Sequence, residues 1–258
     1  MDLELRDRIV LITGGSRGIG LACAQAFSAE GARVVLCARN AEGLEAASRL
    51  LGGVPTFAAD LRDAPAAAAM VDAVESRVGA VDVLVNSAGA AQRTPPGELD
   101  AARWHAALDA KFFSYIHVID PLIKRMGQRG RGVVVNIIGA GGRVAAPTHL
   151  AGGAANAALM LATAGLGAAY GSLGVRVLGI NPGLTETGRV EEGLQAAARA
   201  GGTTIERARA QAVAQIPLGR MASPTEVAEM AVFLASARAS YATAATFALD
   251  GGQHPVVL

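Results

Sequence analysis

Apolar runs of strand length alternate along the chain with longer segments of helical pattern. The short runs predict β-strands at 8–12, 33–37, 56–58, 81–85, 133–138, 175–180 and 246–249. Several are continuously apolar, as is typical of strands covered on both faces of a sheet. The longer segments predict helices at 18–30, 41–51, 64–78, 98–127, 150–171 and 224–236. This repeated βα order predicts an α/β fold with a doubly wound parallel sheet of about seven strands and helices on both faces.

The segment 185–216 interrupts this alternation. It is rich in Ala, Gly, Thr and Arg and has the character of a helical insertion. An insertion at the carboxyl edge of a parallel sheet can cover a ligand as a lid. Because no internal repeat or linker stands out, we predict a single domain over 1–258, with 185–216 as its substrate lid.

Composition supports a globular protein with a sizeable core, since 52% of the 258 residues are hydrophobic and 17% are charged. The 23 basic and 22 acidic residues nearly cancel, and the basic positions are scattered. This balance disfavours nucleic-acid and membrane partners. Cys23 and Cys37 form no CxxC pair and have no histidine cluster beside them. We expect both to be small buried residues of a cytoplasmic protein that has no metal site.

Two segments bear on targeting. The first ten residues include acidic side chains and lack a long apolar stretch, so we expect no signal peptide. The range 151–170 has no charged side chain and is long enough to cross a membrane. It is mostly Ala and Gly, however, and it contains Asn156. We therefore expect a buried helix at an intramolecular or subunit contact.

The first predicted strand runs directly into a glycine-rich loop that contains Gly14, Gly18 and Gly20. A tight turn there requires glycine, because a side chain would collide with the strand, the helix or a ligand. The helix that follows offers free backbone N–H groups and the positive end of its dipole to a pyrophosphate. Three glycines between a strand and a helix predict a dinucleotide site.

The end of the second predicted strand indicates which dinucleotide is bound. An acidic residue there would bind the 2′-hydroxyl of the adenosine ribose, whereas arginine accommodates a 2′-phosphate. This chain has Ala38 followed by Arg39, and Arg17 in the glycine loop adds a second positive charge. We therefore favour NADP(H) over NAD(H), with two solvated surface arginines as the alternative. Asp60 is expected to meet the adenine amino group.

Several motifs occur together in a known order. They are TGGSRGIG at 13–20, Asp60-Leu61, NSAG at 86–89, Asn181-Pro182-Gly183 followed by Thr187, and Asp250-Gly251-Gly252. On these residues the whole chain resembles the short-chain dehydrogenases/reductases. The resemblance implies a Rossmann-like domain, a nicotinamide cofactor, a small-molecule substrate and a homo-oligomer, commonly a tetramer. The predicted cofactor-binding residues are Gly14, Ser16, Arg17, Gly18, Ile19, Gly20, Arg39, Asp60, Leu61, Asn86, Ala88, Gly89, Asn156, Pro182, Gly183, Thr185 and Thr187.

The catalytic part of the resemblance fails. Members of the family use Asn, Ser, Tyr and Lys, in which Tyr transfers the proton and Lys lowers its pKa. The motif order places Lys111, Gly139, Gly152 and Asn156 at these positions. Neither glycine can transfer a proton or hold an oxyanion with a side chain. The glycine pair at 152–153 also costs a helix about 1 kcal/mol per residue relative to Ala, which indicates close approach of a ligand or helix.

Two nearby residues are candidates for the missing acid–base chemistry. His149 precedes the fifth helix, close to the position of the absent Tyr, and histidine titrates near neutrality. Lys111 has a long side chain whose pKa burial would lower. Solvated side chains are the alternative for both. Asn156 can still bind a ribose hydroxyl. Tyr115 and Tyr170 are not expected to substitute; Tyr170 lies roughly 27 Å beyond position 152 along the helix.

These patterns predict an NADP(H)-dependent oxidoreductase that transfers hydride to or from a small carbonyl or alcohol-type substrate and has a non-standard proton donor. The alternative is a catalytically inactive dinucleotide-binding protein that acts as a sensor or partner subunit. A weaker alternative is a lyase or isomerase on the same scaffold, because a fold does not fix its chemistry.

Overall fold

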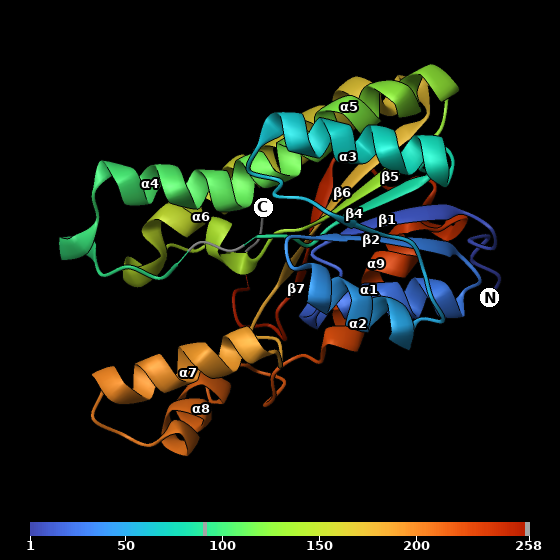
Figure 1. The fold of residues 1–258 in the computed structure, drawn as a ribbon. Coiled ribbons are helices and arrows are strands. Elements are labelled where there is room, and N and C mark those ends of the chain that lie inside the picture. Colours follow the sequence, from blue (N-terminus) through green and yellow to red (C-terminus); the bar gives the residue numbers. More distant parts are fainter. Residues whose placement is uncertain (90–91, 256–258) are drawn as a thin grey trace.

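A computed structural model describes residues 1–89 and 92–255 of the chain. Its centre is one parallel sheet in the order β3-β2-β1-β4-β5-β6-β7 (Figure 1). This architecture confirms the predicted doubly wound sheet. The strands are β1 (Ile9–Thr13), β2 (Arg33–Ala38), β3 (Thr56–Ala58), β4 (Val83–Asn86), β5 (Gly132–Ile137), β6 (Val175–Pro182) and β7 (Ala245–Leu249).

Helices cover both faces of the sheet (Figure 1). One face carries α1 (Gly18–Ala29), α2 (Ala41–Leu50) and α9 (Pro224–Ala235). The other carries α3 (Ala64–Arg77), α5 (Ser114–Arg129) and α6 (Leu150–Tyr170). Because side chains alternate along a strand, β1 supplies Val10 and Ile12 to the first core and Ile9 and Leu11 to the second. The near-continuous apolar strands follow from this two-sided burial.

The predicted single helix over 98–127 is wrong in one respect that matters for function. The structure has α4 (Ala101–Leu108), a π-helical turn (Asp109–Phe113) and then α5. A π-turn inserts extra backbone into a helix and occurs frequently at functional sites. Here the turn carries Lys111 inward, and its Ala110 carbonyl approaches Gly89 so closely that no β-carbon would fit there.

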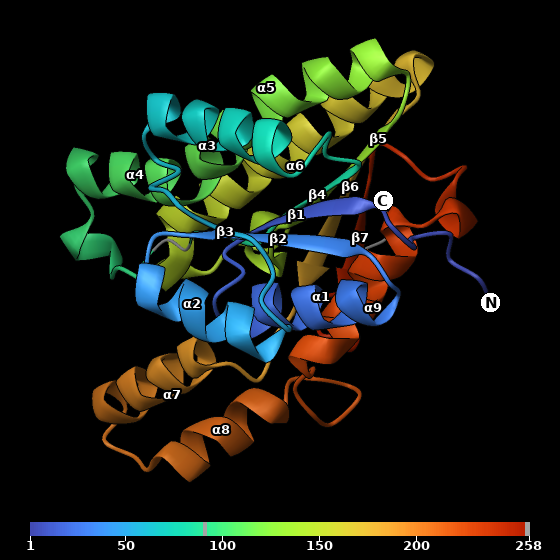
Figure 2. The ribbon, with the colours of Figure 1, turned by 45° about the vertical axis from the view of Figure 1, so that its right-hand side comes forward.

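The interrupting segment forms a helical hairpin of α7 (Gly188–Ala200) and α8 (Ile205–Val213). The hairpin has a small core of its own that includes Leu194, Ala208 and Met221. An ion pair between Glu191 and Arg209, 2.5 Å long, joins the two helices. Figures 1 and 2 show the hairpin standing apart from the two helical layers. The expected helical insertion is therefore present.

Among the described residues, the segment Pro147–Leu173, which contains α6, is the one helical stretch long and apolar enough to cross a membrane. In the fold this helix packs against the sheet and buries Ala155, Leu159 and Thr163. One face of the helix thus makes the expected intramolecular contact, while other positions such as Leu161 are exposed. Cys23 and Cys37 are buried as predicted, and burial raises the pKa of each thiol to about 12.

Candidate cofactor and substrate site

The predicted cofactor residues gather where the strands end. Nearly all lie in loops or helix starts that follow the carboxyl ends of β1, β2, β3, β4 and β6, and Asn156 lies in α6. In an open α/β sheet this edge is where ligands bind. The sequence-based selection thus converges on one edge of the molecule.

The glycine loop between β1 and α1 has the shape of an anion cradle. Gly14 has a φ of +68°, and a β-carbon there would lie 2.7 Å from the Ser87 carbonyl oxygen. A β-carbon at Gly20 would overlap the Gly14 carbonyl. The residue that precedes α1, Arg17, makes no capping hydrogen bond with its side chain. The first-turn N–H groups of α1 are therefore not satisfied by a side-chain cap, which fits a bound pyrophosphate.

A buried hydrogen-bond chain holds the ends of β1, β4 and β5 together. The Thr13 hydroxyl donates to Asn86 Oδ1 at 3.1 Å, and Asn86 Nδ2 donates to Asn136 Oδ1 at 3.1 Å. Asn136 Nδ2 then donates to the Thr163 hydroxyl of α6 at 3.0 Å. Asn136 and Thr163 were not among the predicted site residues. The signal that marks Asn136 is an amide at the end of an otherwise apolar strand.

The adenosine end of the site is rich in arginine. Arg17 and Arg39 are exposed, and within the described ranges neither pairs with a carboxylate. Asp60 is held by the Nε of Arg62 at 3.0 and 3.1 Å. This hydrogen bond, with a smaller contribution from Arg39, lowers the pKa of Asp60 to about 2. The carboxylate expected to meet adenine is thus already engaged by a neighbouring side chain.

The end of β6 and the start of α7 close over the glycine loop. Gly183 N donates to the Leu249 carbonyl at 3.0 Å, which fixes the turn after β6. Thr185 is buried, and its hydroxyl donates to the Gly183 carbonyl at 3.2 Å. The Thr187 methyl group lies 3.6 Å from the position of a β-carbon at Gly18. The N-termini of α1 and α7 therefore face the same space.

The imidazole of His149 occupies the space beside Gly152. A β-carbon added to Gly152 would lie 2.7 Å from His149 Nδ1 and 2.8 Å from Nε2. A β-carbon on Gly141, from the opposite wall, would lie 2.8 Å from His149 Cδ2. The ring therefore lies close to both glycines, and a larger residue at either position would require the ring to shift. The close approach expected at the 152–153 pair is made at Gly152 by the chain's own histidine.

His149 differs from the other described residues in its hydrogen bonding, and nearby positive charges affect its pKa. Among the described residues, its Nδ1 is the buried side-chain polar atom that has no hydrogen-bond partner. Burial lowers the pKa of the imidazole, and the positive charges of Arg93 and Lys111 lower it further. The ring is partly buried and so differs from the fully solvated loop histidine that was the alternative.

Asn156 lies one turn beyond Gly152 on α6 and is also buried. Its Nδ2 lies 3.5 Å from the Gly139 carbonyl, at the limit of a hydrogen bond. Gly139 N in turn donates to Asn181 Oδ1 at 3.3 Å. Gly139, Gly152 and Asn156 thus surround one small region, as their spacing predicted.

Lys111 projects into the same region from the π-turn and is only 8% exposed. Its Nζ donates to the Tyr115 hydroxyl and to the Ile137 carbonyl, both at 2.8 Å. Burial first, and then the charge of Arg189, lower the pKa of Lys111 to about 7. The side chain is therefore buried, and the alternative of a solvated lysine is wrong.

The two tyrosines behave as expected. The Tyr115 hydroxyl is fully buried and donates to the Ile137 carbonyl at 2.6 Å. Tyr170 is the last residue of α6, at the other end of that helix from Gly152. Neither stands beside Gly152.

Comparisons with known proteins agree with this geometry. A sequence-family profile described as enoyl-(acyl carrier protein) reductase matches residues 14–254. The chain belongs to the short-chain dehydrogenase/reductase family. D-threitol dehydrogenase of Mycolicibacterium smegmatis is 36% identical over 97% of this chain and 94% of its own length. Cis-4-hydroxycyclohexanecarboxylate dehydrogenase of Sinomonas cyclohexanicum is 33% identical over 95% and 96%.

A solved structure supports the same assignment. L-sorbose reductase of Gluconobacter frateurii, complexed with NADPH and L-sorbose, superposes with a TM-score of 0.93. It is 29% identical and covers 100% of both chains. These relatives of the chain are oxidoreductases named for alcohol or ketone substrates. The chain therefore has the Rossmann-like, NAD(P)-binding fold of its family.

Proposed function

We propose that the protein is an NADP(H)-dependent oxidoreductase that interconverts a small carbonyl compound and its alcohol, with His149 as the proton donor. The observation that carries this proposal is the position of the imidazole, which fills the space beside Gly152 where the family's tyrosine would begin. In this proposal the ionisable imidazole of His149 takes the role that the ionisable phenol of the tyrosine has in other members of the family. Hydride transfer further requires only proximity and orientation of the reactants.

The residues of the carboxyl edge fit a nicotinamide dinucleotide. The glycine loop and the start of α1 would hold the pyrophosphate, and Arg17 and Arg39 would hold a 2′-phosphate. Asn156 would contact the nicotinamide ribose through its amide, in place of a lysine. When bound, the cofactor supplies or accepts the hydride.

His149 would donate a proton to the substrate oxygen during reduction and accept one during oxidation. Its low pKa makes the imidazolium a stronger acid than ordinary histidine, and it makes the neutral ring available as a base at pH 7. Lys111 would stabilise negative charge that develops on the substrate oxygen. The protonated lysine has three N–H bonds, of which two are engaged by Tyr115 and Ile137.

Three further features belong to this proposal. The α7–α8 hairpin would act as a lid, because Thr187 at its start already faces Gly18. The exposed side chains of Trp104 on α4 and Leu161 on α6 would lie at a contact between subunits of a homo-oligomer. A cytoplasmic location fits a cofactor of central metabolism. The relatives are named for substrates that include both a neutral polyol and a carboxylate, so their names do not indicate which substrate class this protein uses.

The test begins with titrations of the protein with NADPH and with NADH, in which the fluorescence of the bound cofactor measures binding. Tight NADPH binding, with weaker NADH binding, is expected, and Arg39→Ala should weaken NADPH binding about tenfold while it leaves NADH unchanged. A panel of ketones and alcohols is then screened by absorbance of the reduced cofactor. Tight binding without turnover across a broad panel would contradict the enzyme proposal and favour a dinucleotide-binding protein without activity.

A further inference from the structure

Arginines without acidic partners mark the carboxyl edge of the sheet. An arginine follows each of the first six strands within seven residues of the strand's end. The one after β3, Arg62, is paired with Asp60. The others have no carboxylate within 4.0 Å in the part of the chain that the structure describes. They are Arg17, Arg39, Arg93, Arg143 and Arg189.

The interior of the site carries the same excess of positive charge. Lys111 is buried, and both of its hydrogen-bond acceptors are neutral oxygens. Arg189 lies close enough to lower the pKa of Lys111. Although Arg189 is solvent accessible, the surrounding protein lowers the pKa of its guanidinium, and the charge of Arg17 lowers it further, while the charge of Glu192 opposes part of this lowering. A site in which positive groups outnumber negative ones favours anionic ligands.

The cofactor phosphates account for part of this charge. Arg17 and Arg39 flank the glycine loop and the end of β2, where a 2′-phosphate would lie. Arg189 is the second residue of α7, and its charge acts on both Arg17 and Lys111, so it lies between the phosphate side and the interior of the site. These assignments leave the loops after β4 and β5, which are neighbouring strands in the sheet.

The loop after β4, which carries Arg93, is joined by its backbone to the segment that carries the proposed proton donor. The backbone N–H of Thr94 donates to the Thr148 carbonyl at 2.9 Å, which joins this loop to the residue before His149. The charge of Arg93 also reaches the His149 ring, whose pKa it lowers. Arg93 is exposed and is therefore accessible to a ligand that enters the site.

We propose that the substrate carries an anionic group, such as a carboxylate, sulfonate or phosphate monoester, which Arg93 binds beside His149. Arginine presents a planar fork of N–H donors that matches all three groups. A bound anion would offset the positive charges around His149 and raise the pKa of its imidazole toward the range in which it can donate a proton. The inference rests on the proposed function, because it places the anion on the compound that His149 protonates.

The experiment compares matched substrates in the full-length protein loaded with NADPH. Keto-carboxylates are tested against their methyl esters, keto-sulfonates against their methyl sulfones, and keto-phosphate monoesters against the corresponding keto-alcohols. Wild type should show a kcat/KM at least tenfold higher for one anionic class than for its neutral counterpart. The class that shows the advantage identifies the chemical source of the anion.

Two arginine variants locate the effect. Arg93→Ala should raise KM for the anionic substrate about tenfold, with little change in kcat or in the neutral substrate. Arg77→Ala is the matched control, because Arg77 is an exposed arginine in the last turn of α3 and its removal changes the net charge equally. It should leave the preference unchanged. Equal kcat/KM for charged and neutral partners, or an equal loss for both in Arg93→Ala, would overturn the proposal.

A binding assay separates this inference from the proposed function. If no compound is turned over, binding of the same anionic and neutral compounds to the NADP⁺-loaded protein is measured by calorimetry. Selective binding of an anion that Arg93→Ala weakens about tenfold would support the anion site even though the oxidoreductase proposal had failed. Absence of selective binding would overturn the anion site.

Discussion

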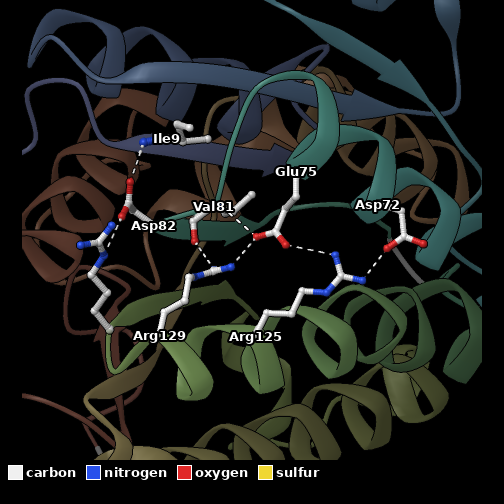
Figure 3. Close-up of polar contacts among 8 residues, drawn as sticks. Ile9, Asp72, Glu75, Val81, Asp82, Arg125 and Arg129 are labelled. Carbon is white, nitrogen blue, oxygen red and sulfur yellow. Dashed lines mark hydrogen bonds and ion pairs between the residues drawn. The ribbon is translucent and has the colours of Figure 1, made fainter.

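Two groups of arginines in this molecule differ in whether they have acidic partners. On the side of the sheet that carries α3 and α5, Arg125 and Arg129 both pair with Glu75, at 3.0 and 2.9 Å, and Arg125 also pairs with Asp72 (Figure 3). Burial alone would raise the pKa of Glu75, but the Val81 N–H and the two guanidinium groups lower it. These charges join two helices and satisfy one another.

At the carboxyl edge the positive groups repel one another. His149 lies near Arg93 and Lys111, and Lys111 lies near Arg189. Uncompensated charge in a partly buried site costs stability, whereas the charges of the network around Glu75 have partners of opposite sign. The difference indicates that the network between α3 and α5 serves the fold and that the carboxyl edge is arranged for a ligand. Four variants can break or sharpen this contrast.

The largest expected effect comes from His149→Ala. Loss of a general acid lowers kcat by about a hundredfold or more, because proton transfer contributes 10² to 10⁴ in rate. Stability should change little, since the ring has an unsatisfied nitrogen. Steady-state rates and urea unfolding measure the two effects. His105→Ala is the matched control, because His105 is exposed on α4; a similar loss of rate in that variant would show that the effect is not specific to the site.

Glu75→Ala should have the opposite effect, with a loss of stability and no change in catalytic rate. Removal of the shared acceptor leaves two guanidinium groups and the Val81 N–H without their partner, and should lower the free energy of unfolding by about 2 kcal/mol. Kinetic constants of the folded protein should stay unchanged. Chemical denaturation and initial rates check this pair of outcomes. Loss of activity without loss of stability would contradict the separation of the two regions.

Gly152→Ala tests whether activity depends on the position of the His149 imidazole. The added methyl group would collide with the His149 ring and displace it, and we expect about a tenfold loss of kcat. Gly165→Ala in the same helix is the control, because a β-carbon there meets nothing within 4 Å. That variant should keep its activity and gain up to about 1 kcal/mol in stability from helix propensity. Full activity in Gly152→Ala would mean that the ring position is not required.

A last comparison concerns the pH dependence of stability that Lys111 contributes. Its pKa falls from the ordinary 10.5 to about 7 on folding, so the unfolded chain binds more protons between these values. Stability should therefore rise with pH across this window, by on the order of 1 kcal/mol per pH unit. The rise should be reduced in Lys111→Met. Urea unfolding at a series of pH values measures it, and an identical slope in both proteins would show that Lys111 is not the buried group responsible.

Much of the fold could be predicted from sequence because it depends on local and periodic signals. The seven strands, the glycine loop and the helical insertion were all visible in this way. The π-turn at 109–113 was not, because one extra residue of backbone in a helix leaves no distinct periodicity. Its consequence is the burial of Lys111, which sequence left open.

The sequence could indicate which residues lie in the candidate site, but it could not indicate how their side chains are arranged. Spacing identified Gly152 and placed His149 near it, yet only the three-dimensional arrangement shows that the imidazole fills the space that glycine leaves. Likewise, Asp60 carried the expected acidic group, but the partner that it holds, Arg62, lies two residues away and gave no signal. The positive charge around Arg93 emerges only when separate strand ends meet at one edge.

The most direct test of His149 as the proton donor is the pH dependence of kcat/KM for carbonyl reduction at saturating NADPH, in wild type and in His149→Gln. Reduction requires the protonated ring, so the wild-type rate should fall about tenfold per pH unit above the pKa of His149. The limb set by His149 should be absent in the variant, whose remaining rate should be low and should vary with pH only through Lys111, the pKa of which is about 7. The same limb in both proteins would contradict the assignment.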